Sequence, residues 1–208
     1  MNKNETINKL AVFASGRGSN LKSLIEAQKN EQFKAKIELV FSDNINAKAL
    51  SIAKENNIFT ESLDRKNFDN KEDFNKAILD ILNRYKIEAI VLAGYMRILS
   101  PIIVNQYKYK ILNIHPSLLP SFPGLDPQKK AIEYGVKVSG ATVHFVDEGV
   151  DSGPIIIQMP VPVLDNDTEN TLSKRILEQE HIIYPKAVDL FTSGKLTIKD
   201  RVVIINNI

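Results

Sequence analysis

The chain has 208 residues, of which 43% are hydrophobic and 25% charged, so it is long enough for one domain with a sizeable core. Its formal net charge of +2 gives no general attraction to nucleic acid or to an anionic membrane surface, and we expect neither as a partner. The absence of cysteine excludes disulfides, thiolate nucleophiles and cysteine-bound zinc, and it fits a cytoplasmic location.

The first half of the chain alternates short apolar runs with helical spacing. No signal peptide is expected at the N-terminus, and nowhere do about 18 apolar residues run together as in a membrane span. The alternation predicts an α/β fold with a doubly wound, mostly parallel sheet. We expect strands at 9–15, 36–42, 88–94 and 110–115, and helices after residue 20 and at 46–56, 71–86 and 100–107.

In the second half the pattern changes. Two strand-like segments, 136–146 and 153–163, are separated by a turn-rich loop that is too short for a crossover helix. This spacing predicts an antiparallel C-terminal hairpin added to the sheet. A long C-terminal helix is expected from about 167 to 193, kinked or broken at Pro185. The segment 200–208 either pairs with the sheet or extends past it, and the sequence leaves this open.

A glycine-rich loop follows the first predicted strand. Gly16 and Gly18 permit tight backbone turns, and Ser19 and Asn20 begin a predicted helix whose free N–H groups attract anions, so a phosphate is the expected ligand. The loop is neither a Walker A motif nor a complete GxGxxG motif. Two alternatives stay open: a plain turn in which Ser19 caps the helix, and a dinucleotide site in which Asp43 holds a ribose.

The sequence NIHP ends another predicted strand. Asn113 and His115 are two residues apart, so on an extended chain they project from the same face. An amide donor beside a titratable imidazole is suited to acyl transfer, because one group can stabilise an oxyanion while the other moves a proton. The alternative is a structural histidine bonded to the backbone.

A carboxylate beside this pair would steer the imidazole and favour its charged form. Asp151 lies in a turn-rich loop that can reach the same end of the sheet, and Asp147 and Glu148 compete for the role on spacing alone. His144 is interpreted as structural, and Glu180 falls near the apolar face of the long helix, an odd place for a carboxylate. Three scattered histidines without cysteine make a metal site improbable, and none is expected.

Five motifs together resemble the folate-dependent phosphoribosylglycinamide formyltransferases. They are ASGRGSNL, VLAGYMRILSP, LNIHPSLLPSFPG, GATVHFVDEGVDSGPIIIQ and EQEHIIYP, and the resemblance covers nearly the whole chain in the same order. It implies a single Rossmann-like formyltransferase domain over 1–208, with a nucleotide-binding half at about 8–110 and a catalytic and folate-binding half at about 111–208. The implied reaction is formyl transfer from 10-formyltetrahydrofolate to the amine of 5-phosphoribosyl-glycinamide in purine biosynthesis, with these two small molecules as partners and without a metal.

The resemblance also implies a role for individual residues. The implied catalytic residues are Asn113, His115 and Asp151; we expect a protonated His115 and Asn113 to stabilise the oxyanion while Asp151 keeps the charge on the imidazole. The implied ribonucleotide-binding residues are Gly18, Ser19, Asn20 and Glu180. The implied folate-binding residues are Lys71, Met96, Arg97, Ile98, Leu99, Asn113 and Asp147. The chain departs from the family pattern at two positions, where Lys71 replaces an arginine and Asp126 a histidine.

Three other functions share part of this pattern. Formyltetrahydrofolate deformylase has the same chemistry with water as acceptor but usually carries an N-terminal regulatory domain, which we do not expect here. Methionyl-tRNA formyltransferase normally adds a C-terminal nucleic-acid-binding domain, also not expected. A dinucleotide-binding regulatory module would use the glycine loop and Asp43 but leave Asn113, His115 and Asp151 without a role. The sequence predicts no oligomeric state.

Overall fold

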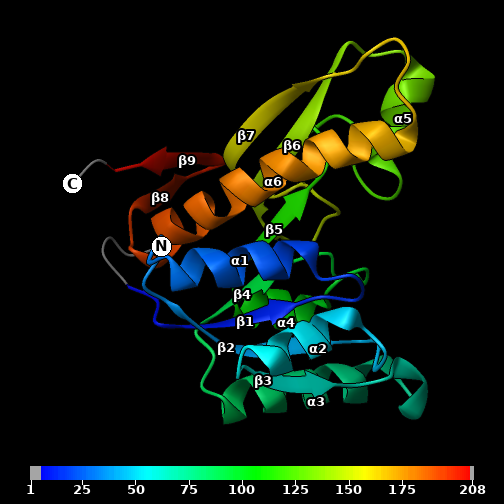
Figure 1. Ribbon diagram of the computed structural model, residues 1–208. Coiled ribbons are helices and arrows are strands. Elements are labelled where there is room, and N and C mark those ends of the chain that lie inside the picture. Colours follow the sequence, from blue (N-terminus) through cyan, green and yellow to red (C-terminus); the bar gives the residue numbers. More distant parts are fainter. Residues whose placement is uncertain (1–5, 207–208) are drawn as a thin grey trace.

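Seven strands form one sheet in the computed structural model, which describes residues 6–206 (Figure 1). The strand order is β3-β2-β1-β4-β5-β6-β7, with parallel pairing from β3 to β5 and antiparallel pairing from β5 to β7. The predicted mostly parallel sheet and its antiparallel hairpin are therefore confirmed. The strands are β1 (Lys9–Phe13), β2 (Lys36–Ser42), β3 (Phe59–Ser62), β4 (Ala89–Leu92), β5 (Ile111–His115), β6 (Val138–Phe145) and β7 (Ile155–Pro162).

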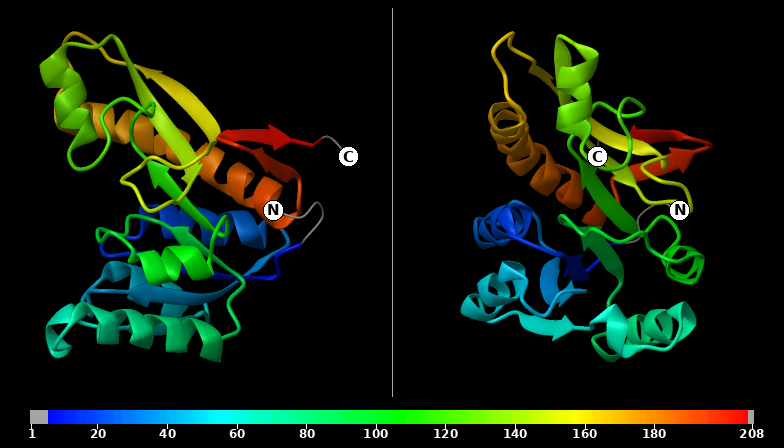
Figure 2. Two further views of the ribbon diagram at one scale, coloured as in Figure 1. Left: turned by 180° about the vertical axis from the view of Figure 1, so that it is seen from behind. Right: turned by 90° about the vertical axis from the view of Figure 1, so that its right-hand side faces the viewer.

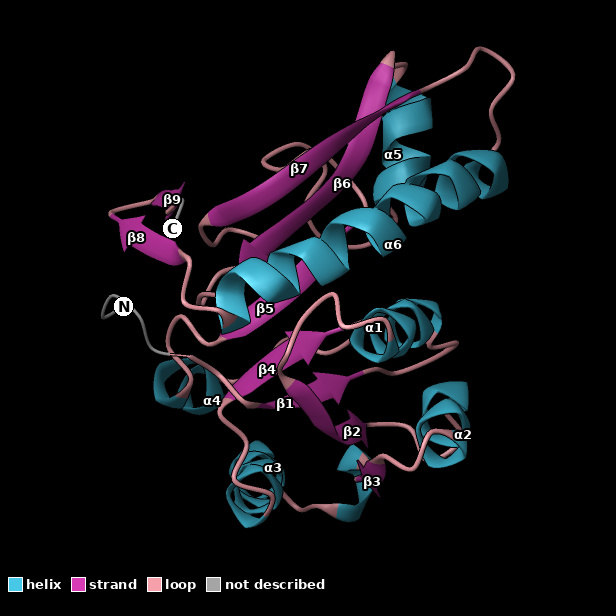
Figure 3. Ribbon diagram, turned by 60° about the vertical axis from the view of Figure 1, so that its left-hand side comes forward, coloured by secondary structure: helices cyan, strands magenta, loops and turns pink. Residues whose placement is uncertain are grey.

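Helices cover both faces of the sheet, as Figure 3 shows. On one face α1, α2 and α6 pack over a large apolar cluster, and on the other α3 and α4 pack over a second cluster. Short η1 (Arg65–Asn67) precedes α3. The helices are α1 (Ser19–Lys29), α2 (Lys48–Glu55), α3 (Lys71–Arg84), α4 (Pro101–Gln106), α5 (Pro127–Tyr134) and α6 (Glu169–Thr192).

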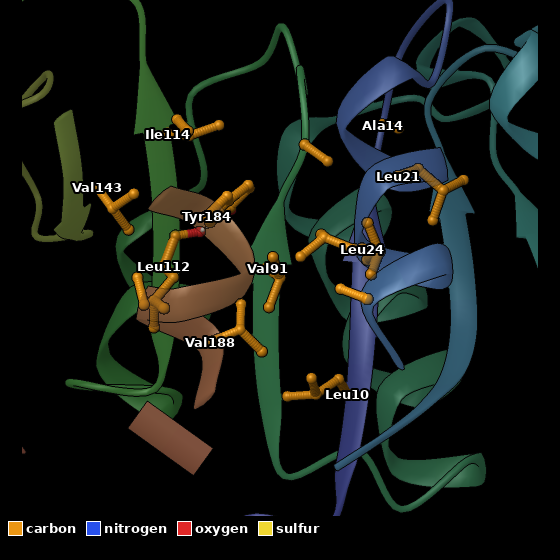
Figure 4. Close-up of a cluster of buried hydrophobic side chains, with 14 of the residues drawn as sticks. Leu10, Ala14, Leu21, Leu24, Val91, Leu112, Ile114, Val143, Tyr184 and Val188 are labelled. Atoms are coloured by element: carbon orange, nitrogen blue, oxygen red, sulfur yellow. Dashed lines mark hydrogen bonds between the residues drawn. The ribbon is translucent and has the colours of Figure 1, made fainter. Parts of the chain in front are cut away.

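The central strands are buried on both faces, which explains why their sequences are continuous apolar runs. All four residues of β4 are buried, and Leu10, Val91 and Leu112 of β1, β4 and β5 belong to the same apolar cluster as Tyr184 and Val188 of α6 (Figure 4). Tyr184 of α6 reaches into this cluster, and its hydroxyl donates to the Leu92 carbonyl at 2.7 Å. The bond satisfies the one polar atom of a fully buried ring, so α6 is fixed against the sheet.

Of the kink or break expected at Pro185, the break is wrong, because α6 continues through this residue as one helix. Proline has no N–H to donate to the carbonyl four residues earlier. That carbonyl belongs to His181, and the Ser23 hydroxyl of α1 donates to it at 3.2 Å instead. The helix begins with a capping box in which Thr168 and Thr171 bond reciprocally. Tertiary packing thus replaces the hydrogen bond that proline removes.

The last described segment pairs in a small sheet of its own. β8 (Leu196–Lys199) and β9 (Val202–Ile205) form an antiparallel pair beside the end of β7 (Figure 2). This resolves the alternative left open for the C-terminal segment, apart from residues 207–208, which lie outside the described part. Within residues 6–206 we find no helix that is both long and apolar enough to cross a bilayer.

Candidate active site

A cavity of about 770 Å³ opens at the carboxyl ends of β1, β4 and β5 and continues beneath the first turns of α6. In doubly wound sheets ligands bind at this end of the strands. Gly18 and Lys71 are the two predicted site residues that do not line this cavity. The predicted residues that do line it are Ser19, Asn20, Met96, Arg97, Ile98, Leu99, Asn113, His115, Asp147, Asp151 and Glu180.

Asp151 bridges the predicted catalytic pair. Its Oδ1 accepts from the Asn113 Nδ2 at 3.3 Å, and its Oδ2 lies 3.3 Å from the His115 Nδ1. The Gly124 N–H donates to the same Oδ2 at 2.8 Å. Burial raises the pKa of Asp151, but the neighbouring His144 side chain and the Gly124 N–H lower it by more. The pKa therefore lies below its usual value, and the carboxyl is ionised near neutral pH.

The two competing carboxylates of this loop are engaged elsewhere. Asp147 lines the cavity, but its Oδ1 accepts from Ser152 at 2.6 Å and from the Gly149 N–H at 3.1 Å. Glu148 accepts from Asn105 of α4 at 3.0 Å. Spacing along the chain did not distinguish these three acids, whereas the folded loop puts Asp151 beside the Asn–His pair.

His115 is only 6% exposed, and both of its ring nitrogens face acceptors. Nε2 lies 2.9 Å from the Phe122 carbonyl, and Nδ1 faces Asp151. Burial lowers the pKa of His115, which the Phe122 carbonyl and the Asp151 charge offset only in part, so the pKa stays below its usual value. The imidazole is therefore mainly neutral at pH 7, which differs from the expectation that Asp151 keeps it charged.

His144 was interpreted as structural, but it lies within the site. It pairs with Asn113 in the β5–β6 register, and its Nε2 is 3.2 Å from the Asn113 Nδ2. Its Nδ1 lies 2.8 Å from the Phe145 carbonyl, so Nδ1 donates there and Nε2 accepts from Asn113. Both amide hydrogens of Asn113 thus have protein acceptors, and an oxyanion would have to displace one of them. The sequence could have revealed His144 only if the strand pairing were known.

The glycine loop leaves the first turn of α1 open to an anion. Gly18 is the N-cap residue, with a left-handed φ of 75°, and no side chain caps the helix. The interpretation of Ser19 as the cap is therefore wrong. A side chain at Gly18 would bring its Cβ to 3.0 Å from the Ala49 Cα, so the position requires glycine for its conformation and for space.

Glu180 of α6 meets this loop from the opposite wall. Its Oε2 accepts from the Asn20 Nδ2 at 2.8 Å, and both residues are buried. Burial raises the pKa of Glu180 to about 7, an effect that the bond from Asn20 reduces. A buried carboxylate with one protein donor has lone pairs free for further donors, such as the hydroxyls of a sugar. The Oδ1 of Asn20 has no partner among the described residues.

Two cations that were not predicted also line the cavity. Arg17 lies in the glycine loop and Lys174 on α6, two turns before Glu180, and among residues 6–206 neither has a hydrogen bond or ion pair with the protein. Their signal in the sequence was weak because exposed basic side chains are common on loops and helices. Asp126, which departs from the family pattern, lines the same cavity with a left-handed φ of 54°.

The segment 95–99 lines the same cavity as Asn113 and His115. Met96 and Ile98 are 66% and 75% exposed, whereas the Arg97 Nε donates to Asp43 at 2.7 Å. Asp43 itself does not line the cavity, so the proposed ribose contact of a dinucleotide has no support in this geometry. Lys71 is the first residue of α3 and is exposed outside the cavity.

Comparison with known proteins agrees with this geometry. The family model described as formyl transferase matches residues 8–188. Phosphoribosylglycinamide formyltransferase of Escherichia coli K12 is 40% identical over 191 residues, which are 92% of this chain and 90% of that protein. The chain belongs to the phosphoribosylglycinamide formyltransferases of the formyl transferase family. The sequence motifs that suggested this family are those that converge on the cavity.

Solved structures show the same relationship. Glycinamide ribonucleotide transformylase 1 of Symbiobacterium toebii superposes with a TM-score of 0.94 at 41% identity, over 97% of this chain and 95% of that one. A formyltetrahydrofolate deformylase of Pseudomonas syringae superposes with a TM-score of 0.87 at 27% identity, and the chain covers 66% of its length. The fold is therefore shared with a hydrolase, although sequence identity is higher to the transferases.

Proposed function

We propose that the protein transfers the formyl group of 10-formyltetrahydrofolate to the amine of 5-phosphoribosyl-glycinamide, a step of purine biosynthesis in the cytoplasm. The observation that carries the proposal is the Asn113–Asp151–His115 cluster, which lies in one cavity with an uncapped glycine loop and a buried carboxylate. Membership of the phosphoribosylglycinamide formyltransferases supports the choice of substrates.

The ribonucleotide is proposed to bind along the wall formed by α1 and α6. Its phosphate would accept from the free N–H groups at Gly18 and Ser19, with the dipole of α1 adding to the attraction. Its ribose hydroxyls would donate to Glu180, which Asn20 orients. Lys174 gives a nearby positive charge with no protein partner among the described residues.

The folate is proposed to bind against the segment 95–99. Met96 and Ile98 present apolar side chains to the cavity, which suits a flat ring, and the buried Leu99 also lines it. Arg97, Asn113 and Asp147 also line the cavity and supply polar groups. Lys71 lies outside the cavity, so any contact would be with a part of the folate that extends beyond it.

The chemistry proposed is direct acyl transfer. The uncharged amine of the ribonucleotide attacks the formyl carbon, which forms a C–N bond and a tetrahedral intermediate with a negative oxygen. An amide hydrogen of Asn113 turns from Asp151 or His144 to that oxygen and stabilises it. A proton leaves the attacking nitrogen and reaches N10 of the folate, whose bond to the formyl carbon then breaks.

His115 is proposed to carry that proton. A mainly neutral imidazole has one nitrogen free to take the proton, provided that this nitrogen turns from its protein acceptor, Asp151 or the Phe122 carbonyl, toward the substrates. The other nitrogen keeps its N–H bonded to the remaining acceptor, and the same turned nitrogen then gives the proton to N10. The positive charge appears close to the oxyanion when the oxyanion forms. Binding both substrates in one cavity contributes the effective concentration that a two-substrate reaction needs.

The test uses the purified protein with 10-formyltetrahydrofolate and follows the absorbance change on loss of the formyl group. Turnover that requires glycinamide ribonucleotide, with formylated ribonucleotide as product, is the expected result. Equal turnover without the ribonucleotide would reject transfer and identify a deformylase. Absence of turnover under both conditions would reject formyl chemistry altogether.

A further inference from the structure

A chain of hydrogen bonds joins the ends of β1, β2 and β4 just behind the cavity. The Ser15 hydroxyl, which follows β1, donates to the Asp43 Oδ1 at 2.5 Å. The Met96 N–H donates to the Ser15 Oγ at 2.9 Å, and the Arg97 Nε donates to the Asp43 Oδ2 at 2.7 Å. The glycine loop and the segment 95–99 are therefore bound to one carboxylate, whose side chain is 10% exposed.

The direction of these bonds requires an ionised carboxylate. Both Asp43 oxygens accept, and because the Ser15 hydroxyl gives its only hydrogen to Asp43, its lone pairs remain for the Met96 N–H. An asparagine at this position could accept from Ser15 but would turn an NH₂ group toward Arg97, which has no acceptor to offer. The link therefore depends on the charge of Asp43 and not only on the shape of its side chain.

The segment 95–99 packs inward at its two ends, through Tyr95 and Leu99, whereas Met96 and Ile98 between them do not. Tyr95 is anchored by its ring, which packs 5.3 Å from Phe13 and 6.3 Å from Phe41 between centroids. Met96 and Ile98, in contrast, are exposed and line the cavity, so their own packing does not fix their position. Two bonds hold this part of the segment instead: the Met96 N–H donates to Ser15, and the Arg97 side chain donates to Asp43.

The other side of the link is the loop that carries Gly18 and Ser19. The Ser15 N–H donates to the Gly94 carbonyl at 3.0 Å, so the two strand-end loops are also bonded through the backbone. The Asn44 Nδ2 donates to the Ser15 carbonyl at 3.3 Å, which adds a second contact from the residue after Asp43. Neither Ser15 nor Asp43 lines the cavity.

We propose that Asp43 is a positioning residue: through Ser15 and Arg97 it holds the folate-facing segment 95–99 in register with the ribonucleotide-facing glycine loop. The proposal rests on the proposed function, because it assigns the two loops to the two substrates. Asp43 touches neither substrate. It acts by holding the backbone that faces the folate in its binding position, so its loss weakens folate binding more than it slows the chemical step.

The test compares Asp43→Asn with the unchanged protein in steady-state kinetics for both substrates. We expect KM for 10-formyltetrahydrofolate to rise about tenfold, roughly the loss of one charge-assisted hydrogen bond, with KM for the ribonucleotide and kcat changed less than about threefold. Ser15→Ala should also raise KM for 10-formyltetrahydrofolate. The double variant should be little worse than either single one, because both changes interrupt one chain of bonds.

Glu61→Gln is the matched control. Glu61 lies within β3, accepts from Arg84 at 3.1 Å and from the Tyr85 hydroxyl at 3.0 Å, and does not line the cavity. This variant loses a comparable carboxylate–arginine pair and should keep both KM values. An unchanged folate KM in Asp43→Asn would overturn the proposal. The proposal would also fail if KM rose equally for both substrates and the melting temperature fell, since this result would indicate only general destabilisation.

Calorimetric titration with tetrahydrofolate separates this proposal from the proposed function. If the unchanged protein binds the folate but transfers no formyl group, the function fails while the dissociation constants of Asp43→Asn and Ser15→Ala still decide the positioning role. Weaker folate binding in both variants supports the role. Unchanged binding in Asp43→Asn contradicts it, whatever reaction the protein performs.

Discussion

Replacing Glu180 with glutamine removes a buried acid whose ionisation opposes folding. The side chain is 6% exposed, and burial raises its pKa from 4.5 to about 7, despite the bond from Asn20. A folded state that holds the proton more tightly than the unfolded chain is most stable at low pH. The contribution is lost as pH rises from the unfolded pKa toward the folded one.

The size of the effect follows from the pKa difference. The rise from 4.5 to about 7 corresponds to about 3 kcal/mol of destabilisation above pH 7, since each pKa unit is about 1.4 kcal/mol. Near pH 5 the penalty is only about 1 kcal/mol by the same linkage. Glutamine can still accept from Asn20, and its NH₂ group can donate to the buried Asn20 Oδ1, which has no partner among the described residues.

Urea unfolding of both proteins at pH 5 and pH 8 measures this difference. Glu180→Gln should exceed the unchanged protein by about 3 kcal/mol at pH 8 and by about 1 kcal/mol at pH 5. The exposed Glu178→Gln on the same helix is the control and should show no pH-dependent gain. A stability difference that is the same at both pH values would refute the buried-acid argument. KM for the ribonucleotide should rise in Glu180→Gln, because this residue of the proposed site lowers the stability of the fold but contributes to binding.

Three further predictions concern the two ends of the cavity. His115→Ala should lose at least about a hundredfold in kcat, the usual range for a proton-transfer group, yet still bind tetrahydrofolate in calorimetry; near-normal rates would reject its role. Gly18→Ala should lower stability by about 1–3 kcal/mol in urea unfolding, because φ is 75° and the added Cβ meets Ala49, and an unchanged midpoint would contradict this. Lys174→Gln should raise KM for the ribonucleotide by about two- to tenfold, and by more at low salt. Lys186→Gln on the same helix is the control and should leave this KM unchanged. Equal effects of the two variants would point to a general loss of positive charge.

The alternating apolar runs and the helical spacing of apolar residues were enough to predict most of the fold. Periodicity over 71–86 predicted α3, which the structure has at Lys71–Arg84. Two elements were not predicted. β3 is a half-exposed edge strand without a continuous apolar run, and α5 was missed although Pro127 at its start and Gly135 after its end were usable signals. The interruption expected at Pro185 failed because a contact from α1, distant in sequence, replaces the missing bond.

The candidate site was predictable where residues share a strand and not where loops meet. Asn113 and His115 could be paired from their spacing, since alternate residues of a strand share a face. The choice of Asp151 depended on the fold of the β6–β7 loop, and the position of His144 depended on strand register. Roles taken from the resemblance, such as folate contact by Lys71, remain predictions.

The bond between Asn20 and Glu180 joins residues 160 positions apart, and it has a consequence for biosynthesis. While the ribosome is still making the chain, the glycine loop emerges early, but the wall opposite it is synthesised only with α6. Contacts of such long range form late and slowly compared with local ones. The proposed ribonucleotide site is therefore complete only after α6 has been synthesised, and affinity for that ligand would report that synthesis has passed α6.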